Sequence, residues 1–335
     1  MNKKVLVVCR NFPYRIGGAE LSLLNELNSL NSAVITLLYQ EQSFLKLDLK
    51  CLNVEKEIVI SDFFSFKFFN FFEFFCNYKK LNNKLNQIKP EFDLVITQGL
   101  WSSVAINYSK LEGVESRYYL RDETSINKFI NYETGIKGFI RSVFNFFEFP
   151  FLKFYSKRNK QGLLDANVIY SNSNYIAKEV KRVFGVASEV KYPAIDTDVL
   201  KSSFSCCVTP EVKGVVMIGD TRIKGIDVFL SLAKTFPDEL FYIFGKKSNF
   251  KTKLKNVRHM GWSSEPGFPY SLAKVILVPS LWDEAFGRVS IEAQSLDIPV
   301  IVSNKGGLPE TVNNNINYIA ENELEFYYKL KYMLN

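Results

Sequence analysis

The sequence predicts an α/β protein of two doubly wound domains, each built on a mainly parallel sheet. Short apolar runs alternate with helical patterns along the whole chain of 335 residues, and this alternation is typical of βαβ units. The length suits two domains of about 150 residues each. The periodicity breaks between Tyr192 and Pro210, where prolines and polar residues gather, and this break indicates the join.

The apolar runs fall into two series of predicted strands. The first series is expected at 5–9, 34–38, 57–60, 94–97, 117–120 and 168–171, and the second at 215–218, 241–244, 257–260, 275–278 and 300–303. The predicted organisation is a first domain over 1–195, a linker over 196–210 and a second domain over 211–320. Residues 321–335 are expected to form a final helix that packs back toward the first domain.

The composition favours a cytoplasmic protein. The N-terminus runs from two lysines directly into an apolar stretch of strand length, without the pattern of a signal peptide. No run of 18 uncharged apolar residues occurs, which argues against a transmembrane helix. The five cysteines include no Cys-x-x-Cys pair, so neither a disulfide framework nor a zinc site is expected.

The formal net charge of +7 is concentrated in two segments. Residues 63–89 hold five Lys and one Glu, and residues 137–160 hold six Lys or Arg and one Glu. Both segments are also crowded with Phe; residues 63–75 alone contain nine. Basic residues mixed with large apolar ones suit an anionic membrane surface better than a nucleic acid, although part of this Phe must belong to the core.

The most informative stretch is 279–309, which follows a predicted strand and contains Glu284 and Glu292. We expect Glu284 in the strand-to-helix loop and a helix that begins near Arg288. The backbone amides of Phe286, Gly287 and Arg288 would then lie at the helix N-terminus, where a phosphate binds well. Glu292, one turn into the helix, could accept hydrogen bonds from two ribose hydroxyls.

This stretch resembles the E-x7-E donor signature of the retaining glycosyltransferase family 4. The loop at 10–20, the strand end at 171–173 and the segment at 192–198 are similar to other parts of that family. The resemblance implies the GT-B fold, in which two Rossmann-like domains face a central cleft. The first domain would bind the acceptor and the second a nucleoside-diphosphate sugar. Glu284 would contact the hydroxyls of the donor sugar, and Glu292 the ribose.

Two loops are further candidates under this resemblance. Gly17 and Gly18 follow the first strand, where a tight turn could expose amides to the diphosphate or the acceptor. In the loop 219–225, Lys224 matches a cation that the family places on the diphosphate. Asp220 stands where the family usually carries Arg, so we expect Arg222 to supply the second cation.

The chain also departs from the family in its first domain, where many relatives carry a His. The single His of this chain is His259, in a predicted strand of the second domain, for which a structural role is favoured. Asp122 follows a strand whose end should face the site, and with Glu284 it is the catalytic candidate; its alternative is a helix cap. Asp196 and Asp198 imitate a metal-binding D-x-D motif, but their position indicates a structural role.

The implied reaction is retaining transfer of a sugar from a nucleoside diphosphate to an acceptor hydroxyl, without a metal or other cofactor. The expected acceptor is a lipid-linked saccharide of bacterial surface polysaccharide synthesis, met at the inner face of the plasma membrane, with no nucleic-acid partner. Two alternatives remain open. One is a nucleotide-sugar 2-epimerase-like enzyme of the same architecture, and the other is a non-catalytic sugar-binding or membrane scaffold.

Overall fold

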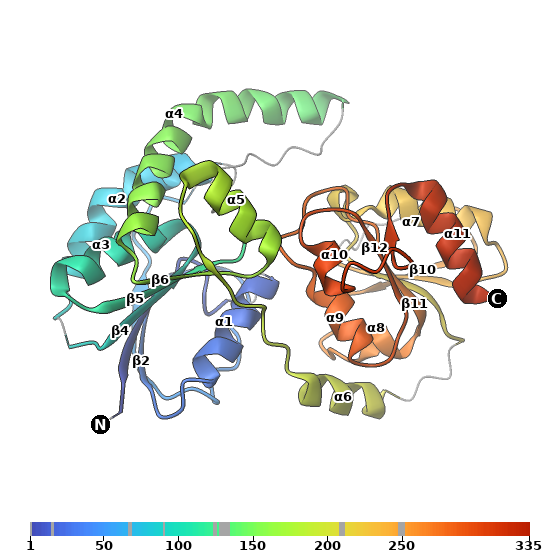
Figure 1. Ribbon diagram of the computed structural model, residues 1–335, viewed down its shortest axis with the longest axis horizontal. Helices are drawn as coiled ribbons and strands as arrows, with labels where there is room; N and C mark the ends of the chain where they lie inside the picture. Colours follow the sequence, from blue (N-terminus) through green and yellow to red (C-terminus); the bar gives the residue numbers. More distant parts are fainter. Residues whose placement is uncertain are drawn as a thin grey trace. The chain divides into compact units, whose positions relative to one another are not determined.

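The computed structural model describes residues 2–14, 17–65, 69–89, 91–122, 126, 135–207, 212–246 and 252–335. The chain divides into two compact units, Met1–Ala194 and Ile195–Asn335, each an α/β unit around its own sheet (Figure 1). The division lies one residue from the predicted end of the first domain.

The first unit is built on a parallel sheet of seven strands in the order β3-β2-β1-β4-β5-β6-β7. The strands are β1 (Lys4–Val8), β2 (Val34–Gln40), β3 (Val54–Ile60), β4 (Leu94–Gln98), β5 (Glu115–Leu120), β6 (Val168–Ser171) and β7 (Glu189–Val190). The helices are α1 (Gly18–Asn28), α2 (Asn70–Asn86), α3 (Ser102–Glu112), α4 (Gly135–Asp165) and α5 (Asn174–Phe184), with a 3-10 turn, η1 (Gly99–Trp101), after β4.

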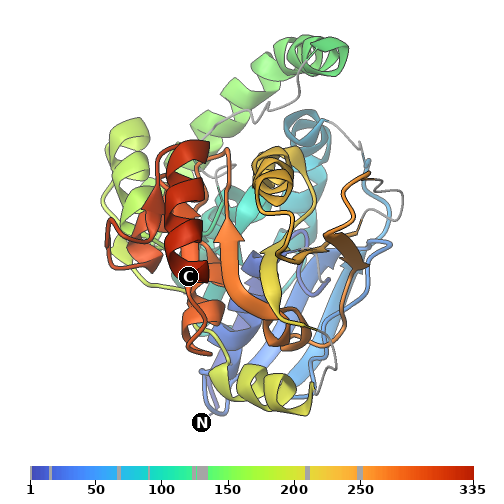
Figure 2. The same cartoon turned by 90° about the vertical axis from the view of Figure 1, so that its right-hand side faces the viewer.

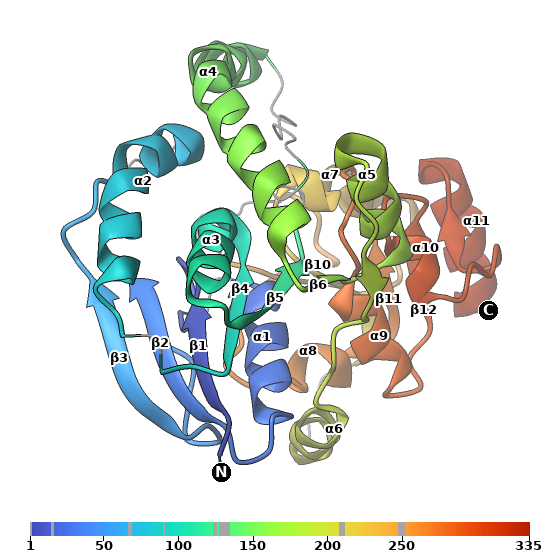
Figure 3. The same cartoon turned by 60° about the vertical axis from the view of Figure 1, so that its left-hand side comes forward.

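Helices cover both faces of this sheet, which explains why its central strands read as continuous apolar runs. Leu6 and Val8 of β1 pack into one core cluster with side chains of α2, α3 and α4. Val5 and Val7 point to the other face and pack with side chains of α1. Figure 3 shows α2, α3 and α4 together on their side of the sheet.

The second unit is built on a parallel sheet of six strands in the order β10-β9-β8-β11-β12-β13. The strands are β8 (Gly214–Ile218), β9 (Phe241–Phe244), β10 (Val257–Gly261), β11 (Ala273–Val278), β12 (Val300–Ser303) and β13 (Ile319–Ala320). The helices are α6 (Thr197–Cys206), α7 (Ile226–Thr235), α8 (Phe268–Ser271), α9 (Arg288–Gln294), α10 (Leu308–Thr311) and α11 (Glu323–Leu334), with a 3-10 turn, η3 (Arg222–Lys224), before α7.

This sheet is also covered on both faces. Helices α6, α8, α9 and α10 contribute to one core cluster. Helices α7 and α11 contribute to the other and lie side by side in Figure 2. All eleven predicted strands are present. The two that the sequence missed, β7 and β13, have only two residues each, too few to carry a periodic pattern.

One prediction about domain organisation differs from the structure. The predicted linker contains α6, which belongs to the second unit because Leu200 and Phe204 pack into its core; residues 208–210 of that segment lie outside the described residues. The final helix, α11, is present and places Phe326 and Leu330 in the core of the second unit. Its position follows from β13, which pairs with β12 and leads directly into the helix.

Candidate active site

Both units carry their candidate residues where the strand order reverses. In an open parallel sheet the loops after the two strands at this point diverge and leave a crevice at their carboxyl ends, where ligands bind. The reversal falls between β1 and β4 in the first unit and between β8 and β11 in the second. The sequence-predicted residues Glu284 and Lys224 follow the second pair of strands, and Asp122 follows β5, next to the first pair.

Glu284, which is buried, forms an ion pair with the partly exposed Lys224 in the second unit. The Nζ of Lys224 lies 2.8 Å from Oε1 of Glu284, and the hydroxyl of Ser280 donates to the same oxygen. Burial alone would raise the pKa of Glu284. The charge of Lys224 and the hydrogen bonds that it and Ser280 donate outweigh this effect, so the pKa lies below its ordinary value. Glu284 is therefore an ionised acceptor with a cation beside it.

Glycines fix the two loops that carry this pair. Gly225 has a φ of +85°, and a Cβ there would lie 1.8 Å from the carbonyl oxygen of Pro279. The turn at Gly306 and Gly307 packs against the loop of Glu284, because a Cβ on Gly306 would lie 2.3 Å from the carbonyl oxygen of Glu284. The amide of Gly307 donates to this carbonyl at 2.7 Å. The backbone around Glu284 is thus held on two sides.

Helix α9 begins at Arg288, as predicted, and Glu284 lies in the preceding loop. Gly287 caps the helix with a φ of +124°, and the side chain of Phe286 is buried. Glu292 accepts a hydrogen bond of 2.5 Å from the hydroxyl of Tyr270 and lies 3.2 Å from a guanidinium nitrogen of Arg288. Burial and the carboxylate of Glu292 raise the pKa of Tyr270, so this hydroxyl stays a donor.

Arg222 and Asp220 make contacts that the sequence did not predict. The Nε of Arg222 lies 2.8 Å from Oδ2 of Asp227, and both side chains are about half exposed. Asp220 is buried and its Oδ2 lies 3.2 Å from Nε2 of His259. Gly245 makes room for it, because a Cβ there would lie 2.2 Å from the Asp220 carboxyl carbon. Asp220 therefore joins the single His of the chain in a packed pair.

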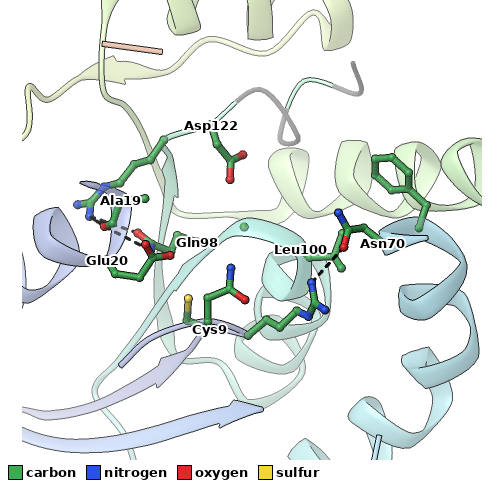
Figure 4. Close-up of a pocket in the computed structure, with 12 residues that line it drawn as sticks. Cys9, Ala19, Glu20, Asn70, Gln98, Leu100 and Asp122 are labelled. Atoms are coloured by element: carbon green, nitrogen blue, oxygen red, sulfur yellow. Dashed lines mark hydrogen bonds between the residues drawn. The ribbon is translucent and has the colours of Figure 1, made fainter. Parts of the chain in front are cut away.

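A pocket of about 120 Å3 marks the switch point of the first unit (Figure 4). It is lined by the loop after β1, the first turn of α1, the start of α2 and the residues after β4 and β5. The lining residues are Cys9, Arg10, Asn11, Ala19, Glu20, Asn70, Phe71, Gln98, Gly99, Leu100, Arg121 and Asp122. Amides, carboxylates and guanidinium groups thus line the pocket together with a few apolar side chains.

Ion pairs and hydrogen bonds order the charged groups of this pocket. Arg10 lies 2.7 Å from the buried carboxylate of Glu73 and donates to Asn70 at 3.3 Å. Arg121 donates to Gln98 and to the carbonyl of Ala19. The acidic side chains Glu20 and Asp122 and the cationic side chains Arg10 and Arg121 thus line one small pocket.

Two carboxyl groups lie at the pocket in different environments. Burial raises the pKa of Glu20, and the negative charge of Asp122 raises it further. The Asp122 carboxylate points toward the open centre of the pocket (Figure 4).

The sequence predicted Asp122 for this site, whereas Asn70 and Phe71 come from a segment interpreted only as Phe-rich. No local motif signals them.

Gly17 and Gly18 lie at the start of α1, next to this pocket. The amide of Gly17 donates at 2.9 Å to Oε2 of Glu20, the half of a capping box that the residue three positions into the helix supplies. This amide therefore donates within the first turn of α1, and a role of the Gly17 and Gly18 amides toward a phosphate stays a prediction. Gly17 has an extended backbone with φ −163°, which other residues also adopt.

Asp196 is the N-cap of α6, where its carboxylate accepts the amide of Val199 at 3.0 Å. Capping is a structural role, as predicted for the Asp196–Asp198 segment that resembles a metal-binding D-x-D motif. Among the residues that the structure describes, no group of three or more His, Cys, Asp or Glu is arranged to hold a metal ion.

The fold that these two units define is GT-B. Sucrose-phosphate synthase from Thermosynechococcus elongatus superposes with a TM-score of 0.72 at 14% identity, over 99% of this chain and 90% of that one. Anabaena Alr3699/HepE, solved in complex with UDP, gives 0.72 at 16% identity over the same shares. WaaG, a glycosyltransferase of lipopolysaccharide biosynthesis, gives 0.62 at 15% identity, over 99% of this chain and 90% of its own.

The sequence comparisons are more local. Residues 211–326 match the model of the family described as glycosyl transferases group 1. An uncharacterized 41.2 kDa protein in the cps region of Klebsiella pneumoniae is 33% identical over 100 residues, which are 28% of this chain and 28% of that protein. The family match thus covers the unit that carries Lys224, Glu284 and Glu292.

Proposed function

We propose that this chain is a retaining glycosyltransferase of family 4, which moves a sugar from a nucleoside diphosphate to an acceptor hydroxyl. The observation that carries the proposal is the ion pair of Lys224 with the buried Glu284, at the switch point of the unit that matches glycosyl transferases group 1. A cation and an ionised carboxylate at this place can bind a diphosphate and the hydroxyls of its sugar. A solved structure of the same fold, HepE, holds UDP-glucose.

The proposed reaction is limited by the leaving diphosphate, which gains negative charge as the glycosidic bond breaks. Lys224 would stabilise that charge without reorganisation, since its position is already fixed by Glu284 and the turn at Gly225. Arg222 would approach from the same loop once its exposed pair with Asp227 exchanges for phosphate. The amides of Phe286, Gly287 and Arg288 would donate to the phosphates from the start of α9.

Glu292 and Glu284 have different proposed partners. Glu292 would accept hydrogen bonds from the ribose, and Tyr270 and Arg288 orient its carboxylate for this. Glu284 would accept hydrogen bonds from the hydroxyls of the transferred sugar. Asp122 would contact the acceptor in the pocket of the first unit, where an amide-lined and carboxylate-lined surface suits a saccharide.

The proposed acceptor is a lipid-linked saccharide of a bacterial surface polysaccharide, met at an anionic inner membrane surface. The support is the local similarity to a cps-region protein and the basic, Phe-rich segments of the first unit. No helix among the described residues is long and apolar enough to cross a membrane. The contact we propose is therefore peripheral.

Turnover of labelled nucleotide sugars in the presence of a bacterial lipid extract tests the proposal. A glycosyltransferase incorporates label into the lipid fraction, with the anomeric configuration of the donor retained, and Glu284→Gln abolishes incorporation. A 2-epimerase would convert the nucleotide sugar to its 2-epimer without any acceptor, and a scaffold would turn over nothing. Incorporation should continue in EDTA; complete loss there, with recovery on adding manganese, would refute the metal-free mechanism.

A further inference from the structure

The exposed face of α4 changes character along the helix. Over its first half this face is apolar: Phe139, Phe146 and Phe147 are 71%, 76% and 63% exposed. Together with Val143 they follow the i, i+4, i+7, i+8 spacing that places side chains on one stripe of a helix. Ile140 and Phe149 extend the stripe and are also exposed.

Over its second half the exposed face is cationic. Leu152, Tyr155 and Leu163 are buried against α2 and α3. The exposed charged side chains between them are Lys153, Lys157, Arg158 and Lys160.

The one acid between residues 138 and 160 is Glu148. It is 2% exposed, and its Oε1 accepts the amide of Phe71 at 2.5 Å. Between residues 138 and 160, α4 itself therefore carries no exposed carboxylate beside these cations.

The apolar half is an anchored part of the first unit. Phe144 packs edge-on against Phe69 with ring centroids 5.2 Å apart, and Glu148 caps the start of α2. Pro150 lies inside α4 and cannot donate the helical hydrogen bond. Near it α4 bends, and its first half extends beyond α2 and α3 (Figures 1 and 3). The apolar stripe is thus presented away from the core.

Phe content alone does not explain this exposure. The other Phe-rich segment leads into α2, and there Phe63, Phe71 and Phe74 are buried in the core. Phe72 and Phe75 of the same helix pack against Phe151. Among the described Phe residues of this first segment, Phe64 and Phe75 are exposed and the others are buried or partly buried, whereas Phe139, Phe146, Phe147 and Phe149 of α4 are all exposed.

We propose that the first half of α4 is a membrane-docking element that inserts Phe139, Phe146 and Phe147 into an anionic lipid surface, while Lys153 and Lys157 meet the head groups. An interfacial helix buries its apolar face about 5–10 Å deep and gains from basic residues beside anionic lipid. A second copy of the chain is the competing occupant of this face, and the sedimentation experiment below distinguishes it. This inference deepens the proposed function by assigning its membrane contact to one helix.

The test is binding of the full chain to vesicles of phosphatidylglycerol and phosphatidylethanolamine, compared with vesicles of phosphatidylcholine. Phe139→Ser/Phe146→Ser/Phe147→Ser should lower the partition coefficient more than about 100-fold. Lys153→Gln/Lys157→Gln should lower it about 25-fold at low salt, from about fivefold for each charge. Binding to phosphatidylcholine should be much weaker.

Matched controls come from the second unit. Leu324, Tyr328 and Tyr332 of α11 are 61%, 61% and 85% exposed, so changing these three to Ser removes a comparable apolar surface. Lys253→Gln/Lys255→Gln removes two exposed charges. Both controls should bind vesicles as the unchanged protein does.

The proposal is overturned if the Phe variant binds anionic vesicles as tightly as the unchanged protein does. It is also overturned if either control variant loses as much vesicle binding as the variant that it matches. It is also overturned if sedimentation shows a dimer that the Phe variant dissociates while vesicles bind neither form. Calorimetric titration of nucleoside diphosphates keeps the proposed function separate, because the Phe variant should retain that binding. Vesicle binding without any transfer activity would refute the proposed function and leave the docking element standing.

Discussion

Replacing Lys224 with Met should destabilise the second unit in a pH-dependent way. The change leaves the carboxylate of Glu284 buried, with its side chain 11% exposed, and removes the cation 2.8 Å away. Breaking a fully buried pair costs about 3–5 kcal/mol. Because Lys224 is itself 33% exposed, water can partly replace it, and we expect about 2–3 kcal/mol at neutral pH.

The pH dependence follows from the direction of the pKa shift. In the unchanged protein the pKa of Glu284 is lowered, so the pair stabilises the fold above the ordinary pKa, and this stabilisation is lost as pH falls through the lowered value. Without Lys224, burial dominates and the pKa should rise above its ordinary value. The variant should then lose stability as pH increases, so that the difference is large at about pH 7 and small at about pH 3.

Calorimetric unfolding at both pH values measures this difference, as a fall in melting temperature of about 6–9 °C at neutral pH. Arg222→Met is the matched control, because its pair with Asp227 is half exposed and should be worth no more than about 1 kcal/mol. The double variant Lys224→Met/Glu284→Gln should recover most of the loss. Equal destabilisation at both pH values, or an equal effect of Arg222→Met, would refute the reasoning.

Two further predictions concern the packing around the sites. Gly225→Ala should unfold the second unit at a much lower temperature than Gly261→Ala: both have positive φ, but only at Gly225 does a Cβ meet backbone, 1.8 Å away, while Gly261 has open space. Equal melting temperatures would contradict this. Arg10→Met should destabilise the first unit by about 3–5 kcal/mol in urea unfolding, since it removes the cation 2.7 Å from the buried carboxylate of Glu73. The double variant Arg10→Met/Glu73→Met should lose less unfolding free energy than Arg10→Met alone. A larger loss in the double variant would show that the broken ion pair is not the cause.

The sequence predicted much of the fold because parallel strands covered on both faces have a strong local signal. Runs such as Val5–Val8 and Val275–Val278 are apolar at every position, and the structure buries them on both sides. Helix α6 was missed for the opposite reason. Its sequence is largely polar, and only Leu200 is fully buried, so the segment reads as a linker until its contacts with the second core are known.

The sequence predicted the candidate residues that belong to a motif, but it did not predict the partners that the fold brings to them. Glu284, Glu292 and Lys224 stand in segments that resemble a known motif, and the start of α9 was expected near Arg288. The partners of these residues come from elsewhere in the chain: Tyr270 reaches Glu292 from α8, and His259 reaches Asp220 from β10. These side-chain contacts depend on the order of the strands in the sheet, and the spacing of residues along the chain does not predict that order.

The sequence also did not predict which of the Phe-rich segments is exposed. Consecutive Phe residues exceed what one helix face can bury, which predicts that part of them is exposed. Which part depends on contacts between α2 and α4, where Glu148 and Phe151 join the two helices. The sequence therefore predicted a surface but could not assign it to α4.

The central claim is that the second unit holds the nucleotide of a donor through Glu292 and its sugar through Glu284. Calorimetric titration of UDP, GDP and ADP into the unchanged chain, Glu292→Ala and Glu284→Ala tests it most directly. One of the nucleotides should bind one per chain. Glu292→Ala should weaken it roughly tenfold or more, the loss of a charged hydrogen bond of about 1.5–3 kcal/mol. Glu284→Ala should weaken it less, because the proposed partner of Glu284, the sugar, is absent from the bare nucleotide and Lys224 remains. No binding of any of the three nucleotides, or equal losses in both variants, would contradict the account.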